Sequence, residues 1–502
     1  MGGRVGVAVR RSVTALAITA MFAACGSGGG GSTSTASAGG GTATTGGGTP
    51  TPTVAGCTLR ERQDWVAAQV REWYLFPETL PASLDPTPYA SVDTFLDALT
   101  ATARAQRKDR YFTYLTSIKD ENAYYASGSS AGFGWRLALD SGARLYVTES
   151  FEGAPALAAG VDRGAEILAI GTSASDLKTV SSLYNAGGSV LSDALGPNTA
   201  GTARAFQLRD AGGTRIVTVI KSDFTLTPVS SRYGAQIISD AGQRYGYVNL
   251  RTFIDTADPA LRAAFAQFRA AGVTNIIVDL RYNGGGLVRV AELMSNLLGA
   301  NRATSEVMSY TTFRSEKSLQ NETTFFAPQP QSVAPTRVAF IGTGSTASAS
   351  EFVINAFIPY LRANAGLIGT NTYGKPVGQI ALDRAACDDR LRVIAFALQN
   401  ASRQGAYYDG LATTVEATCR AADDLGYPMG DPREASTRSA LDYLQGKSCT
   451  RITASAAATS DTGGSAMTQA AATTASMAVT RQALLPSGPG MTPAQREVPG
   501  LF

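Results

Sequence analysis

The chain of 502 residues contains no histidine, and this absence excludes several kinds of enzyme. A serine hydrolase with a Ser-His-Asp triad needs histidine to take the hydroxyl proton. The Gly-x-Ser-x-Gly pattern at 128–132 is therefore not the nucleophile turn of such an enzyme. Histidine-rich zinc sites, and iron sites built from two histidines and a carboxylate, are excluded for the same reason. A nucleophilic serine in this chain must pass its proton to a lysine or a carboxylate.

Apolar runs long enough to cross a bilayer are also missing. The first apolar run, from Val13 to Phe22, follows a basic start and is too short for a permanent membrane helix. Residues 1–24 have the order of charge, apolar stretch and small residues that is typical of a signal peptide. We therefore expect no membrane-spanning helix in the mature chain.

The residues around Cys25 resemble the lipobox of bacterial lipoproteins, with the sequence Phe22-Ala23-Ala24-Cys25-Gly26. The resemblance implies that Cys25 becomes a lipidated first residue and anchors the chain to the membrane by lipid alone. Because Gly26 is not acidic, it also implies a location in the cell envelope, on the periplasmic face of the outer membrane. An ordinary cleaved signal with an incidental cysteine is the alternative. Residues 25–56 are rich in Gly, Ser and Thr and predict a flexible linker.

An excess of charge of either sign is absent. The chain has 43 Lys and Arg against 40 Asp and Glu, and removal of residues 1–24 takes away three arginines, leaving 40 of each. A neutral protein lacks the basic surface that nucleic acids require, so we expect no nucleic-acid partner. The sequence also shows no nucleotide, metal or other cofactor motif.

Cysteine is scarce, and its even count after Cys25 predicts two disulfides in an exported protein. Four cysteines allow three connectivities. We favour the pairs Cys387–Cys419 and Cys57–Cys449, because the second would join the start of the folded region to its end.

The pattern of apolar residues divides the rest of the chain into four parts. Stripes at three- to four-residue spacing predict helices in the first part. Short alternating runs predict strands in the second, and strands alternate with helices in the third, which is typical of an α/β layer structure. The fourth is rich in Ala, Ser and Thr, and we expect it to be disordered. The parts are an N-terminal helical unit at 57–127, a strand-rich domain at 128–225, an α/β core at 226–451 and a tail at 452–502.

The strand-rich part resembles a bacterial PDZ domain. Residues 154–170 are similar to the helix–turn–strand hallmark of that fold, and Gly132-Phe133-Gly134-Trp135 stands where PDZ domains keep their carboxylate-binding loop. Successive backbone N–H groups of such a loop can bind the terminal carboxylate of a peptide. A strand-rich insertion without a peptide-binding role is the alternative.

The residues that carry chemistry lie in the α/β core. A buried strand at 336–341 is followed by a turn of small residues and a helix, and Ser348-x-x-Glu351 fits a capping box at the helix start. Ser348 is thus either a plain N-cap or a nucleophile at a helix N-terminus, where the dipole and free N–H groups favour an oxyanion. The two roles are compatible.

Lys375 follows Ser348 by twenty-seven positions and is the best placed base. A lysine accepts a proton only when neutral, so its pKa of about 10.4 in water must fall by burial, at a cost of about 3–4 kcal/mol. Thr372 and Gln379 can orient the amine without adding a negative charge. A solvated loop lysine is the alternative.

The turn Gly284-Gly285-Gly286 ends another buried strand and offers backbone N–H groups without side chains. We expect the N–H groups of Gly285 and Ala349 to form an oxyanion hole. An ordinary glycine turn is the alternative.

Three blocks of the chain resemble the carboxyl-terminal processing peptidases, also called tail-specific proteases. The blocks are Asp279 to Gly286, Ala347 to Glu351, and Tyr373-Gly374-Lys375 with Gln379. The resemblance implies a crotonase-like (ClpP/crotonase type) α/β protease core with an inserted PDZ-like domain. It makes Ser348 the nucleophile, since this serine precedes Ala-Ser-Glu, and Lys375 the base. The spacing to Lys375 from Ser350 is the commoner one in the family.

The resemblance implies a serine endopeptidase that cuts proteins or peptides near apolar C-termini with a Ser/Lys dyad. Two other functions are compatible with the sequence: an inactive scaffold that binds peptides through its PDZ-like domain, and an acyl hydrolase that does not act on peptides. The sequence does not indicate an oligomeric state.

Overall fold

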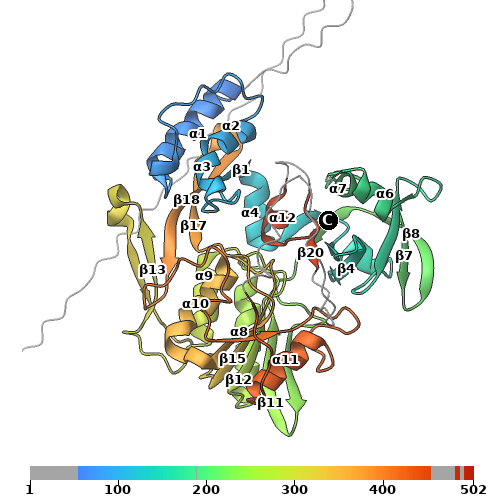
Figure 1. Ribbon diagram of the computed structural model, residues 1–502, viewed down its shortest axis with the longest axis vertical. Coiled ribbons are helices and arrows are strands. Elements are labelled where there is room, and N and C mark those ends of the chain that lie inside the picture. The colour runs from blue at the N-terminus through green and yellow to red at the C-terminus, as the bar shows by residue number, and fades with distance from the viewer. Residues whose placement is uncertain (1–54, 188, 454–480, 487–490) are drawn as a thin grey trace, which may run out of the picture. The chain divides into compact units, whose positions relative to one another are not determined.

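A six-stranded sheet forms the centre of the α/β core (Figure 1), in the order β10-β11-β12-β15-β16-β19. All neighbours from β11 to β19 are parallel, and β10 is an antiparallel edge strand. The strands are β10 (Ala235–Asp240), β11 (Gln243–Asn249), β12 (Asn275–Asp279), β15 (Arg337–Gly342), β16 (Ala365–Gly369) and β19 (Ala417–Arg420). The structure is a computed structural model that describes residues 55–187, 189–453, 481–486 and 491–502.

Helices cover both faces of this sheet, because its buried strands are apolar on both sides. In β12, Ile276 and Val278 pack into one hydrophobic cluster, and Ile277 packs into another on the opposite face. The first cluster is covered by α8 (Ala257–Ala270), α9 (Val288–Leu297) and α10 (Ala349–Leu361), and the second by α11 (Ala435–Leu444). The α/β layer structure that the sequence predicts for this region is therefore present.

A second sheet joins the N-terminal region to the core. Its order is β1-β18-β13-β14, and β17 pairs with β18. The strands are β1 (Tyr114–Ser117), β13 (Val307–Phe313), β14 (Glu322–Phe325), β17 (Val377–Arg384) and β18 (Asp389–Gln399). The sequence pattern suggested a purely helical N-terminal region. That prediction was incomplete, because β1 of this region belongs to the sheet. Strand pairing overrode the local helical periodicity there.

The helices of the N-terminal region pack against the hairpin of β17 and β18. They are α1 (Leu59–Trp73), α2 (Val92–Leu99), α3 (Ala101–Ala105) and α4 (Ile118–Ser127). Phe95, Leu96 and Leu99 form a buried apolar stripe on α2. This stripe shares a hydrophobic cluster with Val377 and Leu391 of the hairpin. This packing places the N-terminal region beside the loop that precedes β17.

The strand-rich region forms a sheet of its own around a separate hydrophobic cluster. Its strand order is β20-β3-β4-β5-β7-β8, with β6 paired to β5, while β2 pairs with β9. Its elements are β2 (Ser129–Gly132), β3 (Trp135–Leu139), β4 (Leu145–Ser150), α5 (Pro155–Ala158), β5 (Glu166–Gly171), β6 (Lys178–Thr179), α6 (Val180–Asn185), α7 (Val190–Asp193), β7 (Ala203–Asp210), β8 (Gly213–Ile220) and β9 (Ser222–Thr225). The short strands that the sequence predicts for residues 128–225 are therefore confirmed.

The described parts of the tail are ordered, contrary to the expectation of disorder from 452 onward. Residues 481–486 contain β20 (Gln482–Ala483), and residues 491–502 contain α12 (Pro493–Glu497). Composition suggested disorder, but four apolar residues near the end are buried, although Leu485 is exposed. The buried residues are Leu484, Val498, Leu501 and Phe502. Residues 454–480 and the expected signal peptide, Cys25 and nearly all of the linker lie outside the described residues.

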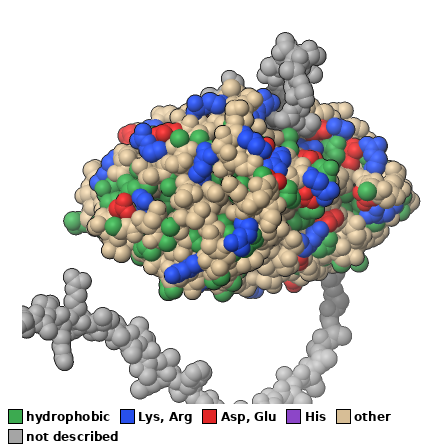
Figure 2. All heavy atoms as spheres, turned by 90° about the horizontal axis from the view of Figure 1, so that it is seen from below, with side chains coloured by type: hydrophobic (Ala, Val, Ile, Leu, Met, Phe, Trp, Pro, Cys, Tyr) green, Lys and Arg blue, Asp and Glu red, His purple; other side chains and the backbone are tan. Residues whose placement is uncertain are grey.

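Within the described residues, no helix is both long and apolar enough to cross a membrane. Figure 2 shows acidic and basic side chains interspersed over the face in view. This mixture agrees with the balanced charge of the sequence.

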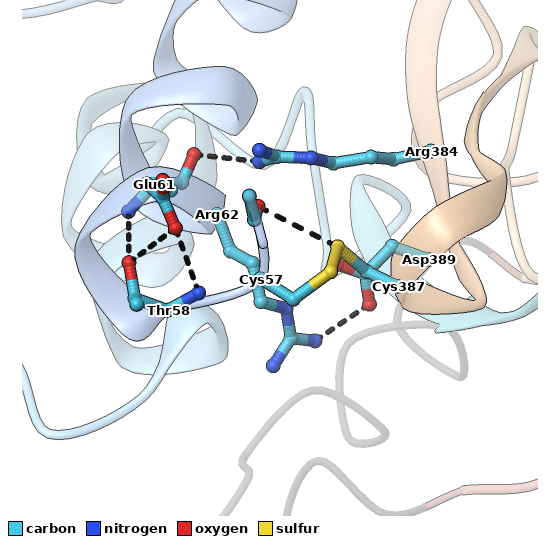
Figure 3. Close-up of a disulfide and its surroundings, with 8 residues drawn as sticks. Cys57, Thr58, Glu61, Arg62, Arg384, Cys387 and Asp389 are labelled. Carbon is cyan, nitrogen blue, oxygen red and sulfur yellow. Dashed lines mark hydrogen bonds and ion pairs between the residues drawn. A yellow bond between two sulfur atoms is a disulfide. The ribbon is translucent and has the colours of Figure 1, made fainter. Parts of the chain in front are cut away.

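The disulfides pair Cys57 with Cys387 and Cys419 with Cys449, so the favoured connectivity was wrong. Cys57 precedes α1, which lies beside the turn between β17 and β18 that carries Cys387 (Figure 3). Cys419 lies on β19, and the chain at Thr450 runs next to that strand, with Arg420 N–H donating to Thr450 O over 2.7 Å. The positions of the four cysteines in the sequence did not indicate which of them lie close together in the fold.

Polar contacts surround the Cys57–Cys387 bridge (Figure 3). The α1 residue Arg62 pairs with Asp389 at 2.6 Å, and Arg384 donates to Glu61 O at 2.7 Å. Thr58 and Glu61 form a complete capping box at the start of α1. These contacts fix the N-terminal helix against the hairpin.

Removal of the Cys57–Cys387 bridge should destabilise the protein more than removal of the other bridge. Its sequence separation is 330 against 30, so the chain-entropy model gives a difference of roughly 2 kcal/mol. Denaturant unfolding of Cys57→Ala/Cys387→Ala and of the matched control Cys419→Ala/Cys449→Ala measures this difference. Equal losses would contradict the prediction, and non-reducing peptide mapping checks the pairing itself.

Candidate active site

Ser348 stands between β15 and α10 in a backbone conformation that a residue with a side chain rarely adopts. Its φ is 54° and its ψ is −114°. Such a conformation costs of order 1–3 kcal/mol, and it persists only where the surrounding structure enforces it. The side chain is half-buried. A strained, partly exposed serine at the start of a helix fits a nucleophile better than a plain N-cap.

Glu351, one turn into α10, enforces this conformation. Its carboxylate is fully buried and accepts three backbone N–H groups. Oε2 accepts from Ser348 N at 3.0 Å and from Lys375 N at 2.7 Å, and Oε1 accepts from Gly374 N at 2.7 Å. One carboxylate thus holds the backbone of the serine and that of the lysine side by side.

The pKa of Glu351 is raised by burial, and its hydrogen bonds work against this effect. The bonds come from Lys375 N, the Thr372 side chain, Gly374 N and Ser348 N. Thr372 also accepts from Leu411 N at 2.9 Å, so it fixes the loop that carries the lysine as well as the carboxyl group. Thr372 therefore acts on the loop and on Glu351.

Lys375 extends from this loop toward β17 and the N-terminal region. Its Nζ donates to Gln379 Oε1 at 3.2 Å and lies 5.0 Å from the centre of the Phe112 ring. Although part of the side chain is exposed, burial lowers the pKa of Lys375. Glu497 and Asp109 oppose this lowering, while Arg392 and Arg496 add to it. Lys375 is thus not the solvated loop lysine of the alternative interpretation.

Gln379 is positioned by residues that sequence reasoning missed. Its Nε2 donates to Phe112 O, and Phe112 N–H in turn donates to the fully buried Asp109 at 2.7 Å. Arg110 donates to Tyr373 O at 2.8 Å and to Gly374 O at 2.5 Å. The N-terminal region therefore supports the lysine and its loop from the side opposite Glu351.

The glycine turn lies directly against Ser348. A Cβ at Gly285 would stand 2.7 Å from the Cβ of Ser348, so no side chain fits there. Gly285 N–H donates to Asn283 Oδ1 at 2.9 Å, contrary to the expectation of a free donor. Gly284 N–H instead donates to the backbone oxygen of Glu497 at 2.9 Å. The turn does present a donor to a peptide carbonyl, but from the preceding residue.

Ser348 rather than Ser350 faces the site. Ser350 is fully buried, and its hydroxyl donates to Asn283 O at 3.1 Å. Ala349, the other expected oxyanion donor, is the first residue of α10, and its N–H has no hydrogen-bond acceptor among the described residues. Nζ of Lys375 donates to Gln379, and among the described residues it makes no hydrogen bond to the hydroxyl of Ser348.

A buried ion network holds the glycine turn in place. Arg281 is fully buried and pairs with Asp279 and Glu434, each at 2.9 Å, and with Asp423 at 3.2 Å. Removing one member of such a network leaves a buried charge unpaired. The charged residues of the first sequence block are thus structural.

The loop Gly132-Phe133-Gly134-Trp135 meets the end of the described chain. Gly134 N–H donates to Phe502 O at 2.9 Å, and Trp135 N–H points to the same oxygen at 3.5 Å. Phe133 and Trp135 are buried in the hydrophobic cluster of this region, together with Phe502. The loop is more distant from Ser348 in sequence than the glycine turn is. Residues 491–502, whose last residue the loop contacts, also contact the glycine turn through Glu497.

Glu497 is the residue of the site that nothing in the sequence indicated. It is buried at the end of α12, accepts from the Tyr125 hydroxyl at 3.1 Å, and interacts electrostatically with Lys375. Burial raises the pKa of Glu497 and Lys375 lowers it. The sequence did not indicate Glu497, because it lies in a tail that has no apolar periodicity.

Comparison with known families covers both the site and the region that supports it. Residues 244–407 match the model of Peptidase family S41, and residues 61–114 match that of the Peptidase S41 N-terminal domain. These two regions of the chain belong to peptidase family S41. The family resemblance of the three sequence blocks is therefore confirmed, and the S41 match spans Ser348, Lys375 and Gln379.

Curated relatives of this S41 chain are C-terminal processing peptidases. The chloroplastic C-terminal processing peptidase of Tetradesmus obliquus is 28% identical over 271 residues, which are 51% of this chain and 54% of that protein. The carboxy-terminal processing protease CtpA of Bacillus subtilis (strain 168) is 28% identical over 280 residues, 54% of this chain and 53% of that protein. The chain thus spans about half the length of the curated relatives it matches.

A solved structure supports the fold. The S41 chain superposes on a Bacteroides fragilis NCTC 9343 protein assigned to the S41 proteases, with a TM-score of 0.58 and 23% identity. The match covers 76% of this chain and 97% of the other. The mixed α/β fold with its N-terminal domain is therefore that of an S41 protease.

Replacement of Glu351 by glutamine should destabilise the S41 chain by about 1–3 kcal/mol, because the amide cannot accept all three buried N–H groups. Denaturant unfolding measures the change. Glu322→Gln on the exposed part of β14 is the matched control and should stay within about 0.5 kcal/mol of the parent. A loss for Glu351→Gln no larger than for the control would show that the carboxylate does not hold the site together.

Proposed function

We propose that this protein is a serine endopeptidase with a Ser348/Lys375 dyad, which cuts proteins or peptides near their C-termini. The observation that carries the proposal is the buried carboxylate of Glu351, which binds the backbone N–H groups of both residues. The lowered pKa of Lys375 and its bond to Gln379 support the role of the lysine as a base. Family membership supports the class of reaction. The crotonase-like description of the core is part of the same proposal.

The reaction begins with neutral Lys375. As Ser348 Oγ forms a bond to the peptide carbonyl carbon, its proton passes to the lone pair of Nζ, and the carbonyl electron pair moves to oxygen. The C–N bond then breaks, and the ammonium gives its proton to the leaving amine. A water molecule next attacks the ester and gives its proton to Nζ. When the ester bond breaks, Oγ takes that proton back, and the enzyme is restored.

The negative charge on the carbonyl oxygen needs donors that are already in place. Ala349 N–H at the start of α10 supplies one of them. The glycine turn supplies the second, through Gly284 N–H, which already meets a backbone oxygen. The helix dipole of α10 favours the same charge.

We also propose that the strand-rich region is a PDZ-like domain that binds peptide ends. The support is the arrangement of Gly134 and Trp135, whose N–H groups point to one backbone oxygen at the edge of β3. Two disulfides support an oxidising compartment such as the cell envelope. The lipid anchor at Cys25 remains part of the proposal.

Replacement of either dyad residue should abolish proteolysis. We expect Ser348→Ala and Lys375→Met each to lower kcat/KM on an unfolded protein substrate at least about a thousandfold. The matched control is Ser345→Ala in the same turn, which should keep near-parental activity. Full activity in Ser348→Ala or Lys375→Met would refute the dyad. Peptide binding without hydrolysis, or hydrolysis of small esters alone, would favour the scaffold or the acyl hydrolase.

The activity should rise with pH as Lys375 loses its proton. Because burial holds its pKa below the ordinary value of 10.5, the midpoint of this rise in kcat/KM should lie below 10.5. Glu497 opposes the lowering, so Glu497→Gln should move the midpoint to lower pH. Asp109, Arg392 and Arg496 also act on the lysine and stay unchanged in this comparison. A midpoint that does not move, or moves upward, would contradict the assignment.

A further inference from the structure

The segment 491–502 runs from the glycine turn beside Ser348 to the edge of the strand-rich sheet. It begins with the cap Thr492, continues through α12, and ends beside β3 (Figure 1). Glu497 of the segment contacts the glycine turn, and residues 500–502 contact β3. The proposed function puts a substrate at both of these places. The contacts of the segment show how firmly it occupies both places.

At the sheet, the segment pairs with β3 in the way an added strand does. Leu137 N–H donates to Gly500 O at 2.8 Å, Phe502 N–H donates to Trp135 O at 3.1 Å, and Gly134 N–H donates to Phe502 O at 2.9 Å. The bridge between Arg136 and Leu501 is antiparallel. The main chain of the segment thus occupies the backbone groups of β3 that would recruit a peptide.

The apolar side chains of the segment are seated in two hydrophobic clusters. Phe502 is 3% exposed and packs with Phe133, Trp135 and the rest of the cluster of the strand-rich region. Leu501 and Val498 pack in a second cluster, whose members include Tyr124 of α4. The burial of these side chains removes apolar surface from water and so stabilises the bound position of the segment.

At the glycine turn, the segment lies in the place of a peptide carbonyl. Gly284 N–H donates to Glu497 O, and a Cβ at Gly284 would stand 2.8 Å from that oxygen and 3.0 Å from its carbon. The carboxyl group of Glu497 faces Lys375 and favours its protonated form. A protonated lysine cannot take the serine proton.

The segment does not have the conformation of a peptide about to be cut. Val498 N–H donates to Ala494 O at 2.8 Å and closes the last turn of α12. The bond between Glu497 and Val498 is therefore held in a helix end, whereas strand pairing at β3 requires an extended chain. The Glu497 carboxylate further opposes the neutral lysine that cleavage needs.

We propose that the segment 491–502 is an intramolecular inhibitor, which occupies the peptide-binding edge of β3 and the glycine turn beside Ser348 at the same time. An arriving peptide must displace it from β3 before it reaches the serine. The inhibitory consequence rests on the proposed peptidase function, whereas the occupation of β3 does not.

The test is to unseat the segment in the full chain. Leu501→Asp/Phe502→Asp places two charges in apolar clusters, and the matched control Leu501→Ile/Phe502→Leu keeps both positions apolar. Hydrogen exchange reports the seat, because the N–H groups of Gly134 and Leu137 lose their acceptors when the segment leaves. The N–H of Val147, which donates to Ala165 O inside the sheet, should exchange alike in both variants. Continued protection of Gly134 and Leu137 in the Asp variant would overturn the proposed seat.

A fluorescent synthetic peptide with the sequence of residues 491–502 then tests occupation without any need for activity. If the segment occupies the edge of β3 in most molecules, only the vacant fraction can bind a second peptide. The apparent affinity for that peptide is then the intrinsic affinity multiplied by the vacant fraction. We expect the Asp variant to bind the peptide at least about tenfold more tightly than the parent and the control. Equal binding by the parent would show that the groove is open and would overturn the proposal.

Hydrolysis of an unfolded protein decides the inhibitory role. The Asp variant should cleave at least about tenfold faster than the control, since more molecules have a vacant site. A different result is that the Asp variant loses the bound segment and binds the peptide, and yet cleaves at the rate of the control. That result would show that the segment is a ligand of β3 but not an inhibitor, and it would overturn the inhibitory role. If no variant cleaves and Ser348 does not react with a fluorophosphonate, the proposed function fails, and the peptide measurement still decides occupation.

Discussion

The buried carboxylate of Glu351 is the interaction on which the rest of the site depends. Ser348 comes after β15, a strand of the central sheet, whereas Lys375 lies on the loop before β17, a strand of the second sheet. The two residues therefore belong to separate structural layers. A single side chain with two oxygen atoms binds the backbone of both. It also sustains the unusual torsion angles of Ser348. Carboxylates are seldom buried without a charged partner, and this one is satisfied by peptide N–H groups and the Thr372 side chain.

Support for the lysine comes from the opposite side, through a relay that begins in the N-terminal region. Asp109 fixes Phe112, the carbonyl of Phe112 orients Gln379, and Gln379 receives the amine. The Cys57–Cys387 bridge and the Arg62–Asp389 pair attach this region to the hairpin that bears Gln379. The N-terminal region therefore helps to position Lys375 and is not merely an appendage of the core.

The elements of the core and its candidate catalytic residues follow from local patterns. The strands at 275–279 and 337–342 each contain a short continuous apolar run. Ser348, Glu351 and Lys375 lie in short blocks with distinctive composition. What the sequence could not give depends on contacts between distant residues. The disulfide partners, the hydrogen bond of Gly285 N–H to Asn283 and the part played by Asp109 all arise from packing. The order of residues 491–502 depends on partners about 360 positions earlier, at Trp135 and Leu137, which no local window can reveal.

The pairing of the segment 491–502 with β3 also affects how the protein behaves in solution. The two-residue strand β20 is the outer neighbour of β3 in its sheet. Without β20 and residues 500–502, β3 would be an edge strand that offers unpaired N–H and C=O groups to any other extended chain. Residues 482–483 and 500–502 cover that edge in succession. A molecule whose edge is bare would be prone to self-association, so the same few residues that fill the groove also protect the protein from aggregation.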